Sequence, residues 1–332
     1  MRPKAVLLHN VNLKNKLFSD AHIERIEKVA DLRYNESPQN PTEDDAKRLL
    51  ADADICVTSW GCPRMTEAIL DAAPNLKLIV HAAGSVKGIV SDAVYDRGIT
   101  VTSGAPALAV GVAETTLGLI ICSLKNVWQL ARITREGRWH GPEQARIREL
   151  YEVTVGVVGA SHTGRHLMKL LQNFEVEVLC YDPVRSAEEI AGYGAAKVEL
   201  DELLRRSDVV TVHAPSIPAT QHMFNRETFG LMKDDAIFIN TARGSLVNEE
   251  DLIAELEKGR FWACLDVTDP EPPAADSPLR SLPNVTLTPH IAGSVNNGHR
   301  RIGRYVTEEI ERFVAGEPAV NPVLREQLAT LA

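Results

Sequence analysis

Three side chains that can bind an anion or exchange a proton follow apolar segments in the second half of the chain. Arg243 follows "FINTA", Glu271 lies in the proline-rich stretch "LDVTDPEPP", and His290 follows "LTP". An arginine can hold a carboxylate through two parallel hydrogen bonds, and an imidazole can accept or return a proton near neutral pH. A carboxylate bonded to the far ring nitrogen would fix the imidazole tautomer. Alone, each residue also fits an ordinary surface turn or loop.

A glycine-containing turn lies upstream of these residues, in "TVGVVGASHTGRH". Gly159 and Gly164 stand between an apolar strand and a helix, but Ser161 occupies the central position where a third glycine is usual. Asp182 ends the next apolar segment, 23 residues after Gly159. This context predicts a dinucleotide site, with pyrophosphate at the helix N-terminus and the acid on a ribose hydroxyl.

The acidic residue of this motif bears on which dinucleotide binds. Asp182 would repel a 2′-phosphate, so the motif favours NAD over NADP, although Arg185 leaves NADP as an alternative. The Cβ atom of Ser161 must either push the phosphates outward or direct the serine hydroxyl at one of them. We therefore expect NAD binding to be tolerated and weaker than usual.

The elements that position these residues alternate between strands and helices along the chain. Apolar strands with amphipathic helices between them fill residues 4–103, with helix N-caps expected at Ser19 or Asp20 and a capping box at Thr42 and Asp45. A single long apolar helix is expected over 107–133, and a second strand and helix series begins at residue 154. Strands at this spacing predict parallel sheets covered on both faces.

Composition limits the possible classes of protein. The chain has 332 residues, enough for two domains, and its formal net charge of -9 argues against nucleic-acid binding. We expect no membrane span, because no apolar run approaches about 18 residues, and no signal peptide. The five cysteines are scattered, which predicts reduced thiols and no metal site. These features together predict a cytoplasmic protein.

The order of arginine, glutamate and histidine after a dinucleotide turn resembles the D-isomer-specific 2-hydroxyacid dehydrogenases. The resemblance covers nearly the whole chain and is carried by "ELYEVTVGVVGASHTG", "FINTARGSLVNEEDL", "LDVTDPEP" and "TPHIAGS". It implies an α/β fold with two Rossmann-like or flavodoxin-like, doubly wound parallel-sheet domains and a cleft between them. Residues 1–105 and 295–332 would form a discontinuous substrate-binding domain, and residues 106–294 the NAD-binding domain. It also implies a homodimer joined through the cofactor domain and its long helix.

The resemblance and the chemistry of the side chains agree on the catalytic roles. Arg243 would bind the substrate carboxylate, His290 would exchange the proton of the 2-hydroxyl group, and Glu271 would orient and stabilise the imidazole. Asp266 would accept a hydrogen bond from the nicotinamide carboxamide. Besides the motif residues Gly159, Ser161, Gly164 and Asp182, the resemblance implies cofactor contacts, mainly through the backbone, at His162, Thr163, His213, Ala214, Pro215, Thr220, Thr241 and Ala242.

The expected substrate loop departs from the family pattern. In "AGSVKGIV", Ser85, Val86 and Lys87 are the substrate-binding candidates; Ser85 replaces a glycine and Lys87 replaces an acid. Lys87 favours a substrate with a second anionic group, and the alternative is a lysine that faces solvent. Leu108 stands where relatives commonly have asparagine after glycine, which removes another polar group. Further candidates for lining the cleft are Trp60, Trp139 and His140.

Several substrates and two other functions stay open on the sequence. The substrates considered are glycerate or hydroxypyruvate, glyoxylate, lactate and 3-phosphoglycerate. One alternative function is an NAD-binding, corepressor-like interaction module, which the lack of long disordered extensions weakens. The other is a formate- or phosphite-type dehydrogenase, which Glu271 disfavours because formate dehydrogenases pair their histidine with glutamine.

Overall fold

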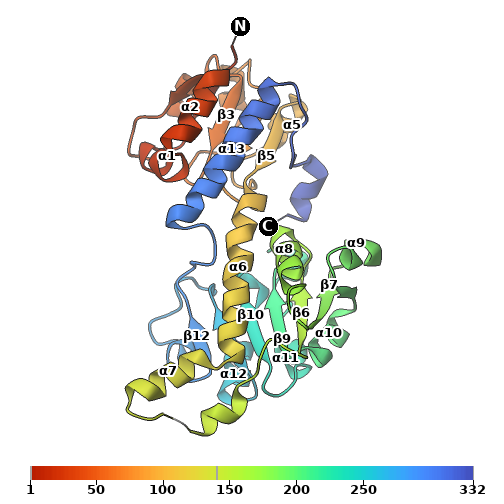
Figure 1. The fold of residues 1–332 in the computed structure, drawn as a ribbon. Helices are drawn as coiled ribbons and strands as arrows, with labels where there is room; N and C mark the ends of the chain where they lie inside the picture. Colours follow the sequence, from red (N-terminus) through yellow and green to blue (C-terminus); the bar gives the residue numbers. More distant parts are fainter. Residues whose placement is uncertain (1, 140, 332) are drawn as a thin grey trace. The chain divides into compact units, whose positions relative to one another are not determined.

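The computed structural model describes residues 2–139 and 141–331, and the chain divides into two compact units (Figure 1). Unit 1 contains residues 2–108 and 294–331, so it is built from both ends of the chain. Unit 2 contains residues 109–293. Each unit has its own parallel sheet, which confirms the expected α/β class.

Unit 1 is built on a five-stranded sheet in the order β2-β1-β3-β4-β5, with every pairing parallel. The strands are β1 (Lys4–Leu7), β2 (Asp31–Tyr34), β3 (Ile55–Thr58), β4 (Leu78–His81) and β5 (Thr100–Ser103). The helices are α1 (Val11–Leu17), α2 (Asp20–Val29), α3 (Glu43–Leu50), α4 (Glu67–Ala72), α5 (Asp92–Asp96) and α13 (His299–Val314). Alternate strand residues enter two different apolar clusters, so both faces of the sheet are buried.

Local sequence signals account for several boundaries in unit 1. The Ser19 hydroxyl accepts a hydrogen bond from the His22 backbone and caps α2. Thr42 and Asp45 form the expected reciprocal capping box at the start of α3. The final helix α13 is amphipathic and lies beside α1 and α2 (Figure 1), with Ile302 and Val306 fully buried. The C-terminal segment therefore completes the core of the N-terminal one.

Unit 2 is built on a seven-stranded parallel sheet in the order β12-β11-β10-β9-β6-β7-β8. The strands are β6 (Thr154–Val158), β7 (Glu177–Tyr181), β8 (Ala196–Lys197), β9 (Val209–Val212), β10 (Ile237–Asn240), β11 (Trp262–Leu265) and β12 (Val285–Leu287). Helix α6 (Ala105–Leu124) is followed along the chain by α7 (Val127–Arg135), α8 (His162–Leu171), α9 (Ala187–Ala191), α10 (Leu200–Arg206), α11 (Arg226–Gly230) and α12 (Glu249–Glu257). Because β6 lies between β7 and β9, strand order reverses there, which is the position where doubly wound sheets bind ligands.

The expectation of one helix over residues 107–133 is wrong. Helix α6 (Ala105–Leu124) ends before Asn126, and α7 (Val127–Arg135) begins after it. The backbone of Asn126 has φ 53° and is left-handed, a conformation that interrupts a right-handed helix and that asparagine tolerates better than most residues. Apolar periodicity on both sides of this residue concealed the break.

The expectation that no apolar segment approaches the length of a membrane span is also wrong, because one helix is long enough and apolar enough to cross a membrane. Helix α6 has 20 residues, and an 18-residue stretch within it has a mean hydropathy of 1.9, with 39% of that stretch buried. The core helices of proteins without membrane spans can be equally long and apolar, so α6 is only weak evidence for a membrane-spanning segment. Alanine, glycine and threonine positions within "AETTLGLIICSL" hid this continuous apolar stretch.

Candidate active site

The residues expected to do chemistry in unit 2 all follow the carboxyl ends of its strands. Because the sheet is parallel, these ends share one edge, where α/β proteins bind their ligands. The glycine turn follows β6, Arg243 follows β10, and Glu271 and His290 follow β11 and β12. The sheet order β12-β11-β10-β9-β6 therefore places the three catalytic candidates on neighbouring strands, with the glycine turn beyond β9.

The turn after β6 requires both of its glycines. Gly159 has φ +100°, and a Cβ atom there would lie 2.6 Å from the Ala214 backbone nitrogen. A Cβ atom on Gly164 would lie 2.0 Å from the Gly159 carbonyl oxygen. The first glycine thus permits the turn, and the second lets α8 begin directly against it. This is the narrow cradle that a dinucleotide pyrophosphate needs.

Ser161 is accommodated in this turn as the N-cap of α8. Its φ of -63° and ψ of -179° suit any L-residue, and its hydroxyl accepts a hydrogen bond from the Gly164 backbone at 3.4 Å. The serine hydroxyl is therefore directed at the backbone of the helix. The sequence had suggested instead that Ser161 would push the phosphates outward or direct its hydroxyl at one of them. The backbone N–H groups of Ser161, His162 and Thr163 have no acceptor among the described residues, which leaves them available to a phosphate.

The side chain of His162 adds no cationic charge to the turn at neutral pH. Burial, followed by the charges of Arg165 and Arg185, lowers the pKa of His162 to about 4. The Arg165 guanidinium lies 3.1 Å from Nδ1 of the same ring. The attraction for a pyrophosphate at this turn therefore comes from backbone amides and from the arginines.

Asp182 connects the glycine turn to the loop after β7. Its Oδ2 accepts a hydrogen bond from the Ala160 backbone at 2.7 Å, and its Oδ1 accepts bonds from Val184 and Arg185 at 2.8 and 3.0 Å. These bonds hold the carboxylate at the carboxyl edge of β7. A carboxylate has further lone pairs, so Asp182 can still accept a ribose hydroxyl, and the Arg185 side chain pairs with Glu189 at 3.1 Å.

His290 and Glu271 are in direct contact. His290 Nδ1 lies 2.7 Å from Glu271 Oε1, and the two side chains are 48% and 43% exposed. With Nδ1–H donating to the carboxylate, Nε2 is left to exchange a proton. The His290 backbone has φ 52°, a left-handed conformation that costs a residue other than glycine about 1–2 kcal/mol. The surrounding loop must compensate for this cost.

Asp266 holds the loop that carries His290. Its carboxylate is 2% exposed and accepts hydrogen bonds from the Thr288 hydroxyl at 2.6 Å, the Ile291 backbone at 2.9 Å and the Ala292 backbone at 2.8 Å. The Asp266 carbonyl accepts a fourth bond from the His290 backbone at 3.0 Å. Asp266 is therefore a positioning residue for His290, a role that the sequence did not reveal. The expected contact with nicotinamide stays a prediction.

Arg243 stands on a turn fixed by a buried asparagine. Asn240, 1% exposed, donates from Nδ2 to the Arg243 carbonyl at 2.9 Å and accepts from the Ala242 backbone at 3.0 Å. A Cβ atom on Gly244 would lie 2.1 Å from the Thr268 carbonyl oxygen, so this turn packs tightly against the loop that leads to Glu271. The Arg243 side chain itself is exposed. Asn240 was missed by sequence reasoning; an amide as the last residue of the buried strand "IFIN" was its signal.

The remaining expected cofactor contacts also lie at the carboxyl edge. Burial lowers the pKa of His213 to about 3, and its ring bonds the Thr211 hydroxyl at 3.0 Å, so only its backbone can face a ligand. The Thr220 hydroxyl donates to the Pro215 carbonyl at 2.6 Å and closes a local turn. Thr241 is buried, and its hydroxyl lies 2.9 Å from the hydroxyl of Thr116 in α6. Side chains at these positions thus shape the edge, and backbone groups remain for the cofactor.

The expected substrate loop belongs to unit 1, where Ser85, Val86 and Lys87 follow β4. Leu108 lies beside this loop, since a Cβ atom on Gly84 would be 3.5 Å from its Cδ1. Trp60 packs edge-on against His299 with ring centroids 6.0 Å apart. Trp139 in unit 2 is 74% exposed, and His140 lies outside the described residues.

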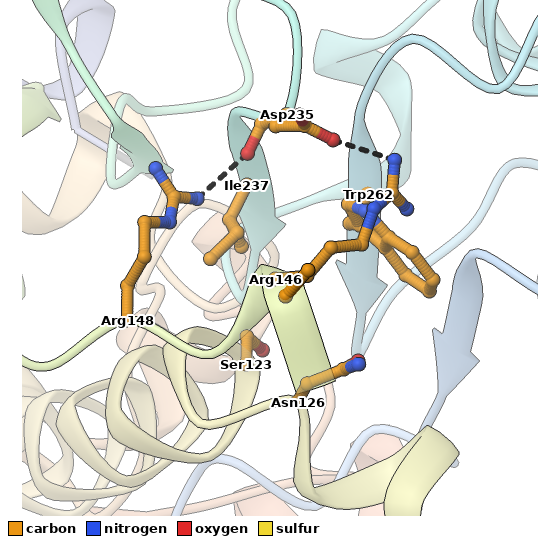
Figure 2. A pocket seen from close by; sticks show the side chains of 8 residues that line it. Ser123, Asn126, Arg146, Arg148, Asp235, Ile237 and Trp262 are labelled. Atoms are coloured by element: carbon orange, nitrogen blue, oxygen red, sulfur yellow. Dashed lines mark hydrogen bonds and ion pairs between the residues drawn. The ribbon is translucent and has the colours of Figure 1, made fainter. Parts of the chain in front are cut away.

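A cavity of about 260 Å³ lies at the opposite, amino edge of the unit 2 sheet. Figure 2 shows Arg146 and Arg148 both pointing at Asp235, with hydrogen bonds of 2.6 Å each. The Arg146 guanidinium also lies 4.8 Å from the ring centroid of Trp262. Arg146 pairs with the Asp235 carboxylate, and Arg148 pairs with Asp208 at 3.7 Å. Ile237 and Trp262 begin their strands at the cavity, so it is separate from the carboxyl edge.

No group of three or more metal-binding side chains occurs among residues 2–139 and 141–331. All five cysteines are free thiols; three are buried and two are partly buried, as expected.

Comparison with known proteins identifies the family. Residues 117–292 match the NAD-binding domain of the D-isomer-specific 2-hydroxyacid dehydrogenases. The chain is 31% identical to a glyoxylate reductase of Thermofilum pendens over 91% of each protein. It is 34% identical to a D-3-phosphoglycerate dehydrogenase of Methanocaldococcus jannaschii over 85% of this chain and 54% of that protein. The chain thus spans about half the length of the phosphoglycerate dehydrogenases that it matches.

A solved structure confirms the fold. A phosphoglycerate oxidoreductase from Rhizobium etli superimposes with a TM-score of 0.85, at 24% identity, over 98% of this chain and 99% of that one. The chain belongs to the D-isomer-specific 2-hydroxyacid dehydrogenase family. The expected resemblance is therefore confirmed, and so is the NAD cofactor, which the glycine cradle and the free amides at the start of α8 fit.

Proposed function

We propose that this protein is an NAD(H)-dependent oxidoreductase that interconverts a D-2-hydroxy acid and its 2-keto acid. The observation that carries the proposal is the 2.7 Å contact between His290 Nδ1 and Glu271 Oε1. This pair follows strands at the same sheet edge as the exposed Arg243 and the dinucleotide turn. Residues 106–294 would bind NAD, and residues 1–105 with 295–332 would bind the substrate.

The proposed mechanism assigns one task to each side chain. Arg243 holds the substrate carboxylate and the 2-oxygen through its planar fork. His290 Nε2 takes the hydroxyl proton during oxidation and returns it during reduction, while Glu271 stabilises the imidazolium that forms. NAD, held by the turn from Gly159 to Gly164, would supply the acceptor for the hydride of C2. Asp182 favours NAD over NADP by accepting a ribose hydroxyl and repelling a 2′-phosphate.

We propose four candidate substrates: glyoxylate, hydroxypyruvate or glycerate, lactate, and 3-phosphoglycerate. Oxidation of NADH and of NADPH should be followed with the corresponding 2-keto acids. We expect turnover with NADH, loss of about 100-fold or more in kcat in His290→Gln, and a raised KM in Arg243→Lys. NADH binding, measured by fluorescence, should persist in both variants.

Two results would support other functions. NADH binding without turnover of any 2-keto acid would favour a corepressor-like binding module. Reduction of NAD by formate or phosphite, together with full activity in Glu271→Gln, would favour the formate- or phosphite-type dehydrogenases.

We also propose a cytoplasmic homodimer joined through α6 and its neighbours. Only 39% of an 18-residue stretch of this apolar helix is buried, and large apolar side chains on it and in the following segment are exposed: Ile121, Val127, Trp128, Trp139 and Ile147. A second copy would cover them. Light scattering should give a molar mass twice that of one chain, and Trp128→Glu should lower the measured mass toward that of a single chain. Binding of the chain to lipid vesicles would instead favour a membrane role for α6.

A further inference from the structure

The loop after β4, residues 82–88, has the carbonyl groups at its start bonded to buried side chains of unit 1. The Ser59 hydroxyl donates to the Ala82 carbonyl at 2.9 Å, and the Ser103 hydroxyl donates to the Gly84 carbonyl. The His81 ring bonds the Ser85 carbonyl on one side and the Thr58 hydroxyl, 2.9 Å away, on the other. The start of this loop is thus fixed by polar side chains from the ends of β3, β4 and β5.

Although these carbonyl groups are hydrogen-bonded, the backbone N–H groups of residues 84–88 in the same loop have no acceptor among the described residues. The next two amides, of Ile89 and Val90, both bond the Val86 carbonyl at 2.9 Å, and the Val86 side chain is buried. Successive free N–H groups on a rigid loop form a binding site for an anion. In the proposed reaction, the substrate carboxylate would suit this site.

Lys87 adds a full positive charge to this group of amides. Its side chain is partly buried, and no ion pair joins it to any described residue. By contrast, Lys77 in the same unit pairs with Asp54 at 3.3 Å. The amides alone can bind one anionic group, so the unpaired ammonium leaves positive charge for another.

We propose that the substrate carries a second anionic group, a carboxylate or a phosphate at C3, and that Lys87 binds it. This inference rests on the proposed function, because it names the substrate class of the same reaction. A charge-assisted hydrogen bond to the substrate anion corresponds to about 10- to 100-fold in kcat/KM. Lys87 is therefore a specificity-determining residue.

Two pairs of 2-keto acids test the proposal, because each pair differs by one anionic group. Oxaloacetate is compared with pyruvate, and 3-phosphohydroxypyruvate with hydroxypyruvate, at saturating NADH. The measured quantity is the ratio of kcat/KM for the dianion to that for the monoanion. We expect one ratio to exceed about tenfold, and the pair that shows it identifies the second group as carboxylate or phosphate.

Variants of Lys87 locate the cause of that ratio. Lys87→Ala should lower the larger ratio by about 10- to 100-fold, and Lys87→Arg should retain most of it. Lys77→Ala removes the same charge elsewhere in unit 1 and should leave the ratio as it was. Equal loss on both members of a pair, or ratios near one in the unaltered protein, would overturn the proposal while the keto-acid reductase function stands. Absence of turnover on these four acids and on glyoxylate would overturn the proposed function itself.

Discussion

Substitution of Asp266 by asparagine separates its structural role from its expected role as a nicotinamide ligand. The asparagine amide oxygen can retain the Thr288 and Ile291 hydrogen bonds now made by Oδ1. The amide nitrogen would then face the Ala292 N–H group, which lies 2.8 Å from Oδ2 in the native protein. The side-chain N–H of the new asparagine would then face the backbone N–H of Ala292, a residue that is 1% exposed, so two buried donors would lie together without an acceptor.

The expected cost follows from these contacts. Loss of one charge-assisted hydrogen bond costs about 1.5–3 kcal/mol, and the unpaired buried N–H of Ala292 adds about 1–3 kcal/mol. The Asp266→Asn variant should therefore be destabilised by roughly 3–5 kcal/mol. The loop would also hold the left-handed backbone of His290 less firmly, so kcat should fall even at saturating NADH.

The assay combines urea unfolding with steady-state kinetics and NADH titration. Asp201→Asn is the matched control, because Asp201 pairs with Arg205 on an exposed helix face at 3.4 Å and should contribute at most about 1 kcal/mol. If Asp266→Asn keeps its stability and its kcat and loses only NADH affinity, Asp266 is a cofactor ligand and the positioning argument is refuted.

Three further predictions concern the glycine turn and a buried histidine. Gly164→Ala should lower NADH affinity by about tenfold or more in fluorescence titration, because its Cβ would lie 2.0 Å from the Gly159 carbonyl, whereas Gly230→Ala, with open space around it, should not. Ser161→Ala should destabilise the protein by about 1 kcal/mol through loss of the N-cap, while NADH affinity changes little; a large affinity loss with unchanged stability would contradict the capping role. Burial lowers the pKa of His213 from 6.5 to about 3, so the unfolded chain binds a proton that the folded chain does not, and stability falls as pH drops below about 6.5. Between about pH 7 and pH 5, the free energy of unfolding measured with urea should fall by about 2 kcal/mol less in His213→Gln than in the unaltered protein. An equal fall in both proteins would refute the lowered pKa of His213.

Sequence patterns predicted the fold class and the strand ends well, because both depend on local signals. Apolar runs separated by helical periodicity indicated two parallel sheets, and the capping box at Thr42 and Asp45 located a helix start. Gly159 and Gly164 indicated the turn, since their spacing reflects close backbone approach. The contact between His290 and Glu271, 19 residues apart, was expected from their chemistry and their order along the chain.

Other features depend on contacts between distant segments and were not predicted. The left-handed Asn126 divides a helix whose apolar pattern continues on both sides. The buried side chain of Asn240 folds back onto its own turn, which a strand pattern does not reveal. Asp266 bonds the backbone of a loop more than 20 residues away, so only the folded chain shows that it holds His290.

The division of the chain into units also sets an order for folding during synthesis. Unit 2 is continuous, so it can fold once residue 293 has left the ribosome. Unit 1 has all five of its strands made first, but Ile302, Val306 and Ile310 of α13 belong to its core and are made after unit 2. The first hundred residues must therefore wait, with an apolar sheet face uncovered, until α13 has been translated. Nascent chains that stall before α13 would expose this face to chaperones.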